Sequence, residues 1–303
     1  MPRIISADEL TGLIAKGGVV LLDASWVMCP KGDTAEWHKK YDGHPDALVN
    51  DKKHAEFDSK RLPGARPFPL DVFCPPGNQT RFDFYTPEQF QALLRYLGVN
   101  QGDTLVTYAR GPMAGMSFAA RAAFVLELYG LAPLVLNGGL TAWKGDVESA
   151  KWTAPPPGNI TINTFQPEGR LATFDELYKG HDQGNSTFDN LDKINYLDCR
   201  PKEMFDEGKG AILGPKSTGY HLKGASHFGN GRICGDQGLV DDQQIKQVTN
   251  GLKPGVETVT ACNTGLGASL AWLALRHVGI PAKMFNGSMT EIAARDSSLI
   301  NEK

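Results

Sequence analysis

The chain has 303 residues, of which 41% are hydrophobic and 21% are charged. Because a domain usually holds about 150 residues, this length predicts two globular domains, and the ordinary composition argues against extended disorder. Lys and Arg number 31 against 34 Asp and Glu, which leaves a formal net charge of -3. This near equality of basic and acidic residues argues against a nucleic-acid partner or an acidic membrane, since binding to either requires a surplus of basic residues.

Targeting signals and metal motifs are not evident in the sequence. No apolar run approaches the roughly 20 residues that cross a bilayer. Asp8 and Glu9 fall where a secretory or mitochondrial signal would be apolar or free of acids, so we expect a cytoplasmic protein with no membrane partner. The cysteines are odd in number, form no Cys-x-x-Cys pair and have no His at metal-ligand spacing. A disulfide scaffold and a zinc module are therefore not expected, and neither is any cofactor.

The predicted elements of the first half alternate between helices and short apolar strands. Ser6 to Leu10 is a capping box, in which a hydroxyl residue and the Glu three places later satisfy amide groups at a helix start. Val19 to Ala24 is too short for a helix and predicts a buried parallel strand. Leu105 to Ala109 predicts another strand, which a glycine-containing loop joins to a helix over Phe118 to Tyr129 that ends at Gly130.

The second half repeats these landmarks in the same order. Thr173 to Leu177 is again a capping box, and Ile194 to Cys199 is again a short apolar run that contains an Asp. His221 to Ala225 then matches an earlier Leu-Pro-Gly-Ala turn, and Thr258 to Cys262 matches the strand that ends at Ala109 in the first half. The Ala-rich segment from 268 to 278 is the second copy of the long helix. This order predicts a duplicated chain.

Strands that alternate with helices so regularly indicate two α/β domains, each a mainly parallel sheet flanked by helices. Thr153 to Gly158 contains three consecutive prolines, cannot continue a helix and falls between the copies. We therefore predict a first domain over residues 1–150, a linker over 151–168 and a second domain over 169–303.

Several of these segments are similar to a known family, the two-domain rhodanese-like sulfurtransferases, which include thiosulfate and 3-mercaptopyruvate sulfurtransferases. The segments that carry the resemblance are Leu22-Asp23-Ala24-Ser25-Trp26, Leu62-Pro63-Gly64-Ala65, Val135-Leu136-Asn137-Gly138-Gly139 with Trp143, His221-Leu222-Lys223-Gly224-Ala225 and the loop after Cys262. The resemblance covers nearly the whole chain. It implies that each half is a rhodanese-like domain and that the second carries the active cysteine, since Ala109 occupies the matching place in the first.

Cys262 is the candidate nucleophile. It stands at the end of a predicted strand, and the loop that follows it, with the candidate substrate-binding residues Asn263, Thr264, Gly265, Leu266 and Gly267, leads into a helix. Glycines let backbone N-H groups turn inward and a helix N-terminus adds about half a positive charge, so this loop suits a thiolate or a persulfide. The chemistry that this permits is attack on a donor's sulfane sulfur, followed by transfer to a thiol or to cyanide.

Two alternative roles for this cysteine are a buried structural thiol and the nucleophile of a phosphatase. A buried structural thiol is the ordinary role of a free cysteine, and we assign it to the other four, Cys29, Cys74, Cys199 and Cys234, because none opens a glycine loop before a helix. A cysteine phosphatase needs an Arg six residues after the nucleophile to clamp phosphate, but that position is Ala268. Phosphate ester hydrolysis is therefore not expected.

The resemblance also bears on the substrate. Thr264 matches the place where mercaptopyruvate enzymes carry a serine, and Asp71 matches an Asp that they place beside it, whereas their His falls near Phe82 and Asp83 here. Neither of their two arginines aligns, so Lys216 is the candidate cation for a carboxylate. Because the loop lacks the cations that hold thiosulfate, we expect a modest preference for 3-mercaptopyruvate as sulfur donor.

The acceptor is expected to be thioredoxin or a low-molecular-weight thiol. The alternative is a catalytically weak or inactive protein that kept the fold for binding or regulation.

Overall fold

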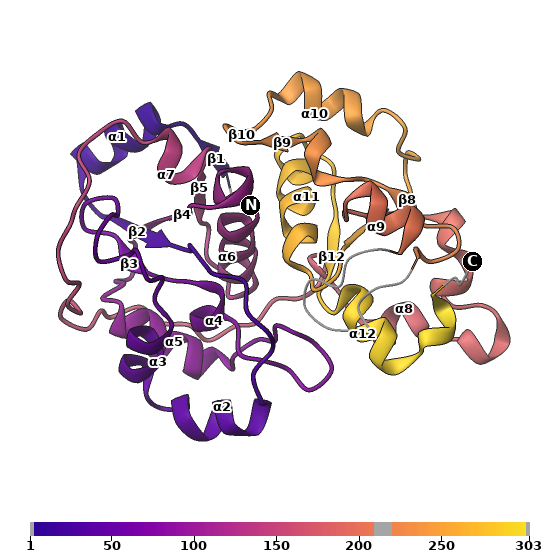
Figure 1. The fold of residues 1–303 in the computed structure, drawn as a ribbon, viewed down its shortest axis with the longest axis horizontal. Coiled ribbons are helices and arrows are strands. Elements are labelled where there is room, and N and C mark those ends of the chain that lie inside the picture. The colour runs from indigo at the N-terminus through magenta and orange to yellow at the C-terminus, as the bar shows by residue number, and fades with distance from the viewer. Residues whose placement is uncertain (1–2, 209–219, 301–303) are drawn as a thin grey trace.

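The computed structural model describes residues 3–208 and 220–300, and Lys216 lies outside these residues. The first half contains β1 (Arg3–Ile5), α1 (Ala7–Lys16), β2 (Val19–Asp23), α2 (Thr34–Tyr41), α3 (Pro45–Lys52), β3 (Arg66–Pro67), α4 (Leu70–Phe73), α5 (Pro87–Tyr96), β4 (Thr104–Tyr108), α6 (Met116–Leu128), β5 (Leu134–Leu136) and α7 (Gly139–Ala142) (Figure 1). The second half contains β6 (Leu171–Ala172), α8 (Phe174–Tyr178), β7 (Asn195–Asp198), α9 (Lys202–Glu207), β8 (Ser226–His227), β9 (Cys234–Gly235), β10 (Gly238–Leu239), α10 (Asp242–Thr249), β11 (Thr258–Ala261), α11 (Leu266–His277), β12 (Lys283–Phe285) and α12 (Ser288–Arg295).

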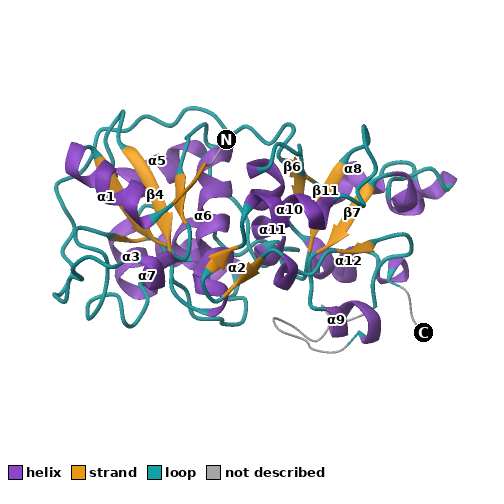
Figure 2. Ribbon diagram, turned by 90° about the horizontal axis from the view of Figure 1, so that it is seen from above, coloured by secondary structure: helices purple, strands orange, loops and turns teal. Residues whose placement is uncertain are grey.

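The two halves have the same sheet topology. The first five-stranded sheet has the order β1-β5-β4-β2-β3 and the second has the order β6-β12-β11-β7-β8, with every pair inside these sheets parallel. Helices cover the faces of both sheets (Figure 2). The predicted fold class, two tandem α/β domains with mainly parallel sheets, is confirmed.

Local sequence signals account for the start and end of several elements. Ser6 accepts a hydrogen bond from the Glu9 amide, and the Glu9 carboxylate accepts one from the Ser6 amide, so the predicted capping box begins α1. Thr173 likewise caps α8 by accepting from the Glu176 amide. The central strand β11 is buried along its length and β4 is buried beyond its first residue, Thr104, as expected for strands that helices cover on both faces.

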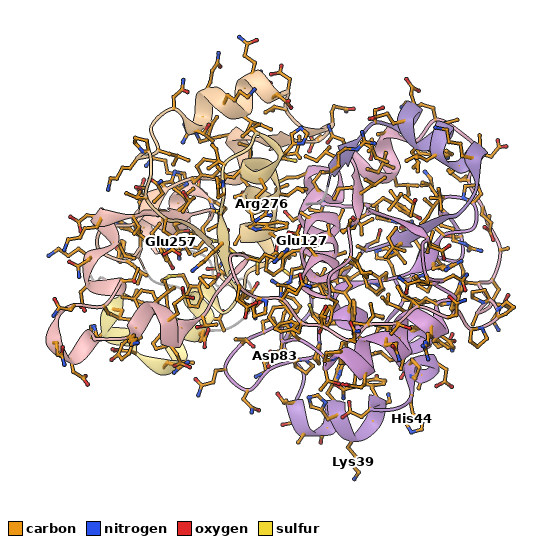
Figure 3. The ribbon with its side chains drawn as sticks, turned by 180° about the vertical axis from the view of Figure 1, so that it is seen from behind. Lys39, His44, Asp83, Glu127, Glu257 and Arg276 are labelled. Carbon is orange, nitrogen blue, oxygen red and sulfur yellow. The ribbon has the colours of Figure 1, made fainter. Side chains whose placement is uncertain are left out.

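The long helices α6 and α11 pack against each other where the two halves meet (Figure 1). Phe124 and Trp272 meet edge to face across this contact, with ring centroids 4.9 Å apart. Beside them the buried carboxylate of Glu127 accepts hydrogen bonds from Arg276 of α11, at 3.2 Å, and from Arg170, at 2.9 Å (Figure 3). One hydrophobic cluster therefore runs through both halves, and the buried charge of Glu127 beside this contact is paired with two arginines.

The chain between Ala142 and Leu171 forms no regular helix or strand, and it follows the surface of the first half. Gly158 and Ile160 donate backbone hydrogen bonds to the carbonyls of Arg95 and Val99, at 2.8 and 3.2 Å. A side chain at Gly158 would collide with the Val99 carbonyl, because a Cβ there would lie 1.9 Å from that oxygen. This connector is thus held by hydrogen bonds and by close backbone packing.

None of the helices in the described parts of the chain is long and apolar enough to cross a membrane.

Candidate active site

Cys262 directly follows β11, the central strand of the second sheet, at the carboxyl edge where ligands bind in open parallel sheets. Its side chain is largely buried, with 6% of its surface exposed. Its backbone N-H donates to the Ser288 hydroxyl at 3.0 Å, and its carbonyl accepts from the Met289 amide at 3.1 Å. The start of α12 therefore holds the backbone of the cysteine from both sides.

Two glycines make the turn after the cysteine possible. Gly265 has φ +80°, a conformation that favours glycine, and a Cβ there would lie 2.5 Å from the Asn286 carbonyl oxygen. Gly267 lies against the cysteine, because a Cβ there would be 3.7 Å from Cys262 Sγ. A Cβ at Gly267 would also lie 3.1 Å from Asn230 Nδ2, so a larger residue there would narrow the space beside the thiol.

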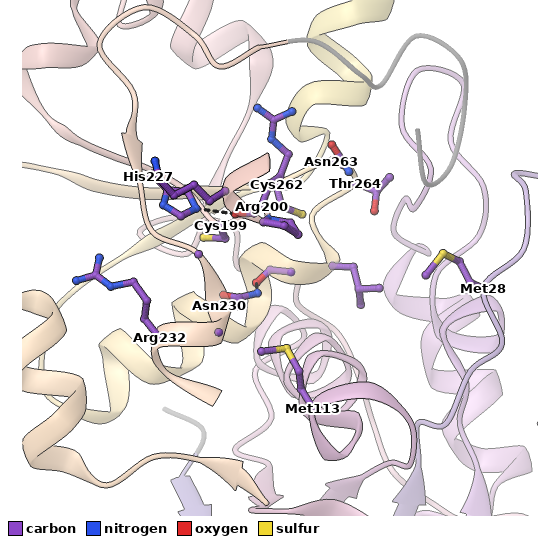
Figure 4. A pocket seen from close by; sticks show the side chains of 16 residues that line it. Met28, Met113, Cys199, Arg200, His227, Asn230, Arg232, Cys262, Asn263 and Thr264 are labelled. Carbon is purple, nitrogen blue, oxygen red and sulfur yellow. Dashed lines mark hydrogen bonds between the residues drawn. The ribbon is translucent and has the colours of Figure 1, made fainter. Parts of the chain in front are cut away.

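A pocket of about 490 Å³ opens at Cys262, and both halves of the chain line it (Figure 4). The first half contributes Met28 and Met113. The second half contributes the remaining wall: Cys199, Arg200, Pro201, Lys202, His227, Gly229, Asn230, Gly231, Arg232, Cys262, Asn263, Thr264, Leu266 and Gly267. Of the predicted site residues, the structure thus brings Cys262, Asn263, Thr264, Leu266 and Gly267 together, while Gly265 shapes the turn among them.

Three cations line this pocket, and two of them have carboxylate partners. Arg200 pairs with buried Asp198, with Nη2 and Oδ2 2.7 Å apart. Lys202 pairs with Asp206 at 2.6 Å. The exposed Arg232 has no carboxylate partner among the residues that the structure describes, and its guanidinium carbon lies 6.0 Å from the centroid of the Phe228 ring. Arg232 is therefore the pocket cation best placed to meet an anionic ligand.

Amide groups supply uncharged polar contacts at the same place. Asn230 donates from Nδ2 to the Gly267 carbonyl at 2.9 Å, which leaves its Oδ1 buried without a hydrogen-bond partner. Asn263 Oδ1 is buried without a partner as well. A buried acceptor without a partner is costly, so both oxygens are suited to accept a hydrogen bond from a bound molecule.

Asp71 lies elsewhere, in α4 of the first half, and it is not among the residues that line the pocket. Its carboxylate accepts from Trp26 Nε1 at 2.8 Å and from Arg81 Nη2 at 3.0 Å, and Cys29 Sγ lies 3.2 Å away. Burial, followed by the charge of Asp71, raises the pKa of the Cys29 thiol. A substrate contact by Asp71 stays a prediction, since its described partners are all residues of the first half.

No group of three or more His, Cys, Asp or Glu that could hold a metal ion occurs among residues 3–208 and 220–300.

Sequence reasoning did not select the other eleven pocket residues, of which Met113, Cys199, Asn230 and Arg232 bear most on the chemistry. Cys199 had a usable signal, because it follows a predicted parallel strand just as Cys262 does, and strands of one parallel sheet end at a common edge. The other three come from loops whose position depends on tertiary packing, and their sequence surroundings carry no motif.

The comparisons with known proteins agree with this architecture. The model of the rhodanese-like domain matches the sequence twice, over residues 6–146 and 173–295. The chain belongs to the rhodanese-like family. It is 30% identical over 288 residues to the putative thiosulfate sulfurtransferase mpst-4 of Caenorhabditis elegans, which covers 94% of this chain and 82% of that protein. It is 24% identical over 282 residues to the 3-mercaptopyruvate sulfurtransferase of Escherichia coli K12, which covers 86% of this chain and 94% of that protein.

A solved structure shares the fold. The crystal structure of the Tum1 protein from Saccharomyces cerevisiae superposes with a TM-score of 0.76 at 20% identity, covering 99% of this chain and 98% of that one. This rhodanese-like protein is accordingly an enzyme of the sulfurtransferase class, as the resemblance predicted.

Proposed function

We propose that this enzyme transfers sulfane sulfur through a persulfide on Cys262. The observation that carries the proposal is the position of this thiol, at the carboxyl end of the central strand and on the wall of a pocket lined by both halves. Its counterpart in the first half is Ala109, which has no nucleophilic atom and is fully buried. One sulfur-carrying site per chain follows from this difference.

The chemistry proceeds in two steps. The Cys262 thiolate attacks the sulfur of the donor, so that a new S-S bond forms while the donor's own bond to that sulfur breaks. With 3-mercaptopyruvate the C-S bond breaks, and the carbon that keeps the electron pair takes the proton of the donor's thiol, which gives pyruvate. With thiosulfate the S-S bond breaks and the leaving group is sulfite. The acceptor, a thiol or cyanide, then takes the outer sulfur and restores the Cys262 thiolate.

The charges around the pocket favour a donor with a single carboxylate. The loop from Asn263 to Gly267 contains no cation, so it lacks the paired positive charges that suit the thiosulfate dianion. Arg232 is the pocket cation without a described carboxylate partner, and it can hold the carboxylate of 3-mercaptopyruvate at the pocket rim. Thr264 lines the same pocket as Cys262, which supports a hydrogen bond from its hydroxyl to the bound donor.

The proposed acceptor is a thiol of the thioredoxin class or a low-molecular-weight thiol in the cytoplasm. All five cysteines of the chain are free, which fits a reducing compartment. The sulfurtransferase names of the relatives do not favour the alternative of an inactive binding protein.

The persulfide is tested by intact-mass measurement after mixing the enzyme with 3-mercaptopyruvate or thiosulfate in the absence of acceptor. We expect the wild-type chain to gain one sulfur atom and the Cys262→Ser variant to gain none. Failure of both donors to add sulfur to the folded wild-type enzyme would overturn the proposal.

The donor preference is tested by comparing kcat/KM for the two donors. Arg232→Ala should lower kcat/KM for 3-mercaptopyruvate about tenfold, mainly through KM, because it removes a charge-assisted hydrogen bond. Lys202→Ala is the matched control, since Asp206 already engages that cation, and it should have a smaller effect. In the same assay, Thr264→Val tests the hydrogen bond from the Thr264 hydroxyl to the donor, and Lys216→Ala tests Lys216 as a cation for the carboxylate. Faster turnover of thiosulfate would contradict the preference.

A further inference from the structure

A second thiol lies directly beside Cys262 in the sheet. Strands β7 and β11 are parallel neighbours in which Asp198 pairs with Ala261. The Cys199 amide donates to the Ala261 carbonyl at 2.8 Å, one residue beyond the last strand pair. In a parallel ladder an amide bonds to the carbonyl of the residue before its partner, so this bond makes Cys199 and Cys262 partners across the two strands.

Partners in neighbouring strands are close enough for a disulfide. Adjacent strands lie about 4.7–4.9 Å apart, and disulfides join residues whose Cα atoms are about 4.4–6.8 Å apart. Partners also project from the same face of a sheet, and both cysteines line the pocket (Figure 4). The two thiols are therefore on one face, in one register and in one cavity.

The surroundings of Cys199 keep its thiol protonated. Its Sγ donates to the Leu197 carbonyl at 3.4 Å, and only 3% of the residue is exposed. Burial, followed by the nearby charge of Cys262, raises its pKa well above that of an ordinary thiol. Because the thiolate is the attacking form of a cysteine, the Cys199 proton must pass to the departing sulfur as the new S-S bond forms.

None of the other cysteines shares this arrangement. Cys234 lies in β9, and its thiol donates to the Met113 carbonyl at 3.7 Å. Cys29 and Cys74 belong to the first half, where they contact Asp71 and Arg121. Of the five, only Cys199 is paired with Cys262 across adjacent strands.

We propose that Cys199 is a resolving thiol for the persulfide at Cys262. The inference rests on the proposed function, because it needs that persulfide as its reactant. Cys199 Sγ attacks Sγ of Cys262, and the Cys199-Cys262 disulfide forms as the bond between Cys262 Sγ and the outer sulfur breaks. The outer sulfur leaves with the bonding pair and takes the Cys199 proton, so that one hydrosulfide ion is released. The outer sulfur is reduced and the two cysteine sulfurs are oxidised, so no further oxidant is needed.

This step gives the enzyme a second outcome besides transfer to an acceptor. When acceptor is scarce, Cys199 reacts with the Cys262 persulfide inside the same molecule, and the outer sulfur leaves as sulfide. The disulfide occupies the nucleophile, so the enzyme takes up no more donor until an external dithiol of the thioredoxin class reduces it. Over a full cycle the donor's sulfur becomes sulfide and the dithiol becomes a disulfide.

The experiment follows the fate of a preloaded persulfide. The enzyme is treated with inorganic polysulfide, freed of small molecules, and sampled by intact-mass measurement while released sulfide is quantified. The wild-type mass should first show one added sulfur and then the loss of that sulfur together with two hydrogens, with one sulfide per chain. Proteolytic peptides should contain Cys199 joined to Cys262.

Cys199→Ser is the decisive variant, because its hydroxyl can still donate to the Leu197 carbonyl. Its persulfide should persist at least about tenfold longer than that of the wild type, with a matching fall in sulfide release. Cys234→Ser is the control, since that thiol is equally buried and also donates to a carbonyl, and it should behave as the wild type does. Circular dichroism and a thermal melt establish that each variant is folded.

The outcomes separate this inference from the proposed function. A wild-type enzyme that takes up no sulfur overturns both. An enzyme that takes up sulfur on Cys262 and keeps it without forming a disulfide, or that joins Cys262 to Cys29, overturns the resolving role and leaves the persulfide mechanism intact.

Discussion

The two halves solve the same electrostatic problem in different ways, at the ends of equivalent strands. Each has a buried aspartate at the end of its second sheet strand, Asp23 in β2 and Asp198 in β7, and each neutralises it with one arginine. In the first half the arginine is Arg110, which comes from the loop after β4 and also donates to Ser25 Oγ at 3.2 Å. In the second half the arginine is Arg200, which lies two residues after Asp198 in the same segment of the chain.

The source of the arginine decides what the loop can do. Arg110 immediately follows Ala109, so in the first half the loop's own side chain fills the space above the strand ends. In the second half Arg200 already neutralises Asp198, so the loop after β11 needs no arginine. Asn263 follows Cys262 there, and the corresponding space is an open pocket. Because the loop after β11 does not have to supply the arginine that neutralises the aspartate, it can hold the nucleophile Cys262 beside an open pocket.

A second contrast lies at the turn after the last strand of each sheet. A Cβ at Gly139 would lie 2.1 Å from the Ala109 carbonyl oxygen, so the first half has no room for a side chain there. The second half has Ser288 at the matching place, with φ +50°, and its hydroxyl accepts from the Cys262 amide. A strained backbone is maintained where it orients the reactive residue.

Exchanging the arginine's position tests the first contrast most strongly. Arg200→Ala leaves Asp198 as an unpaired buried charge and should lower the free energy of unfolding by about 3–5 kcal/mol, measured by urea denaturation. Adding Asn263→Arg supplies the cation from the loop, as Arg110 does in the first half. The double variant should regain part of the lost stability and remain nearly inactive. Full activity in the double variant would contradict the idea that the loop must be free.

Placing a thiol in the first half tests whether its loop is only structural. Ala109→Cys should create no second persulfide in the mass assay, because the site is closed by Arg110 and by Gly115, where a Cβ would lie 2.8 Å from Ala109 Cβ. Overpacking should lower the free energy of unfolding by about 1–3 kcal/mol. Ala109→Ser is the control for size. A second added sulfur in the Ala109→Cys chain would show that both loops can host the chemistry.

Removing the Ser288 hydroxyl tests the second contrast. Ser288→Ala and Ser288→Gly both lose the hydrogen bond to the Cys262 amide, and each should lower kcat about tenfold with KM little changed, since an imprecise nucleophile slows the chemical step. The glycine variant relieves the left-handed backbone, so its melting temperature should exceed that of the alanine variant. Equal kcat in both variants and the wild type would remove Ser288 from its positioning role.

The smallest expected effect concerns the first half's contribution to the pocket. Met113 has φ +54°, unusual for a residue other than glycine, and this turn brings it to the pocket wall of the other half. Met113→Ala should raise KM for 3-mercaptopyruvate about threefold by loosening the wall, with kcat nearly unchanged. Ile14→Ala, at an exposed position in α1, is the control. An unchanged KM would confine donor binding to the second half.

Much of the fold could be predicted from the sequence because its central elements carry strong local signals. The strands β2, β4, β7 and β11 lie in short, mainly apolar segments of the sequence, and the long helices end just before glycines with positive φ. The strands β3, β6 and β8 have two residues each, which is too short for any periodic pattern to mark them.

The site divides in the same way. Cys262 and its loop are contiguous in sequence, so a strand end followed by glycines and a helix identifies them. Arg232 and Met113 reach the pocket through packing between distant segments, which no local pattern records. Asp71 was selected by resemblance alone, and the structure places it with Arg81 in the first half.

The contact between α6 and α11 has a consequence for how the molecule unfolds. The carboxylate of Glu127 belongs to the first half, whereas its arginine partners are Arg170, at the end of the connector, and Arg276 in α11, so separating the halves would leave unpaired a charge whose side chain is only 3% exposed. The edge-to-face contact of Phe124 with Trp272 would be lost at the same time. We therefore expect the two repeats to unfold together, and a calorimetric scan should show a single melting transition.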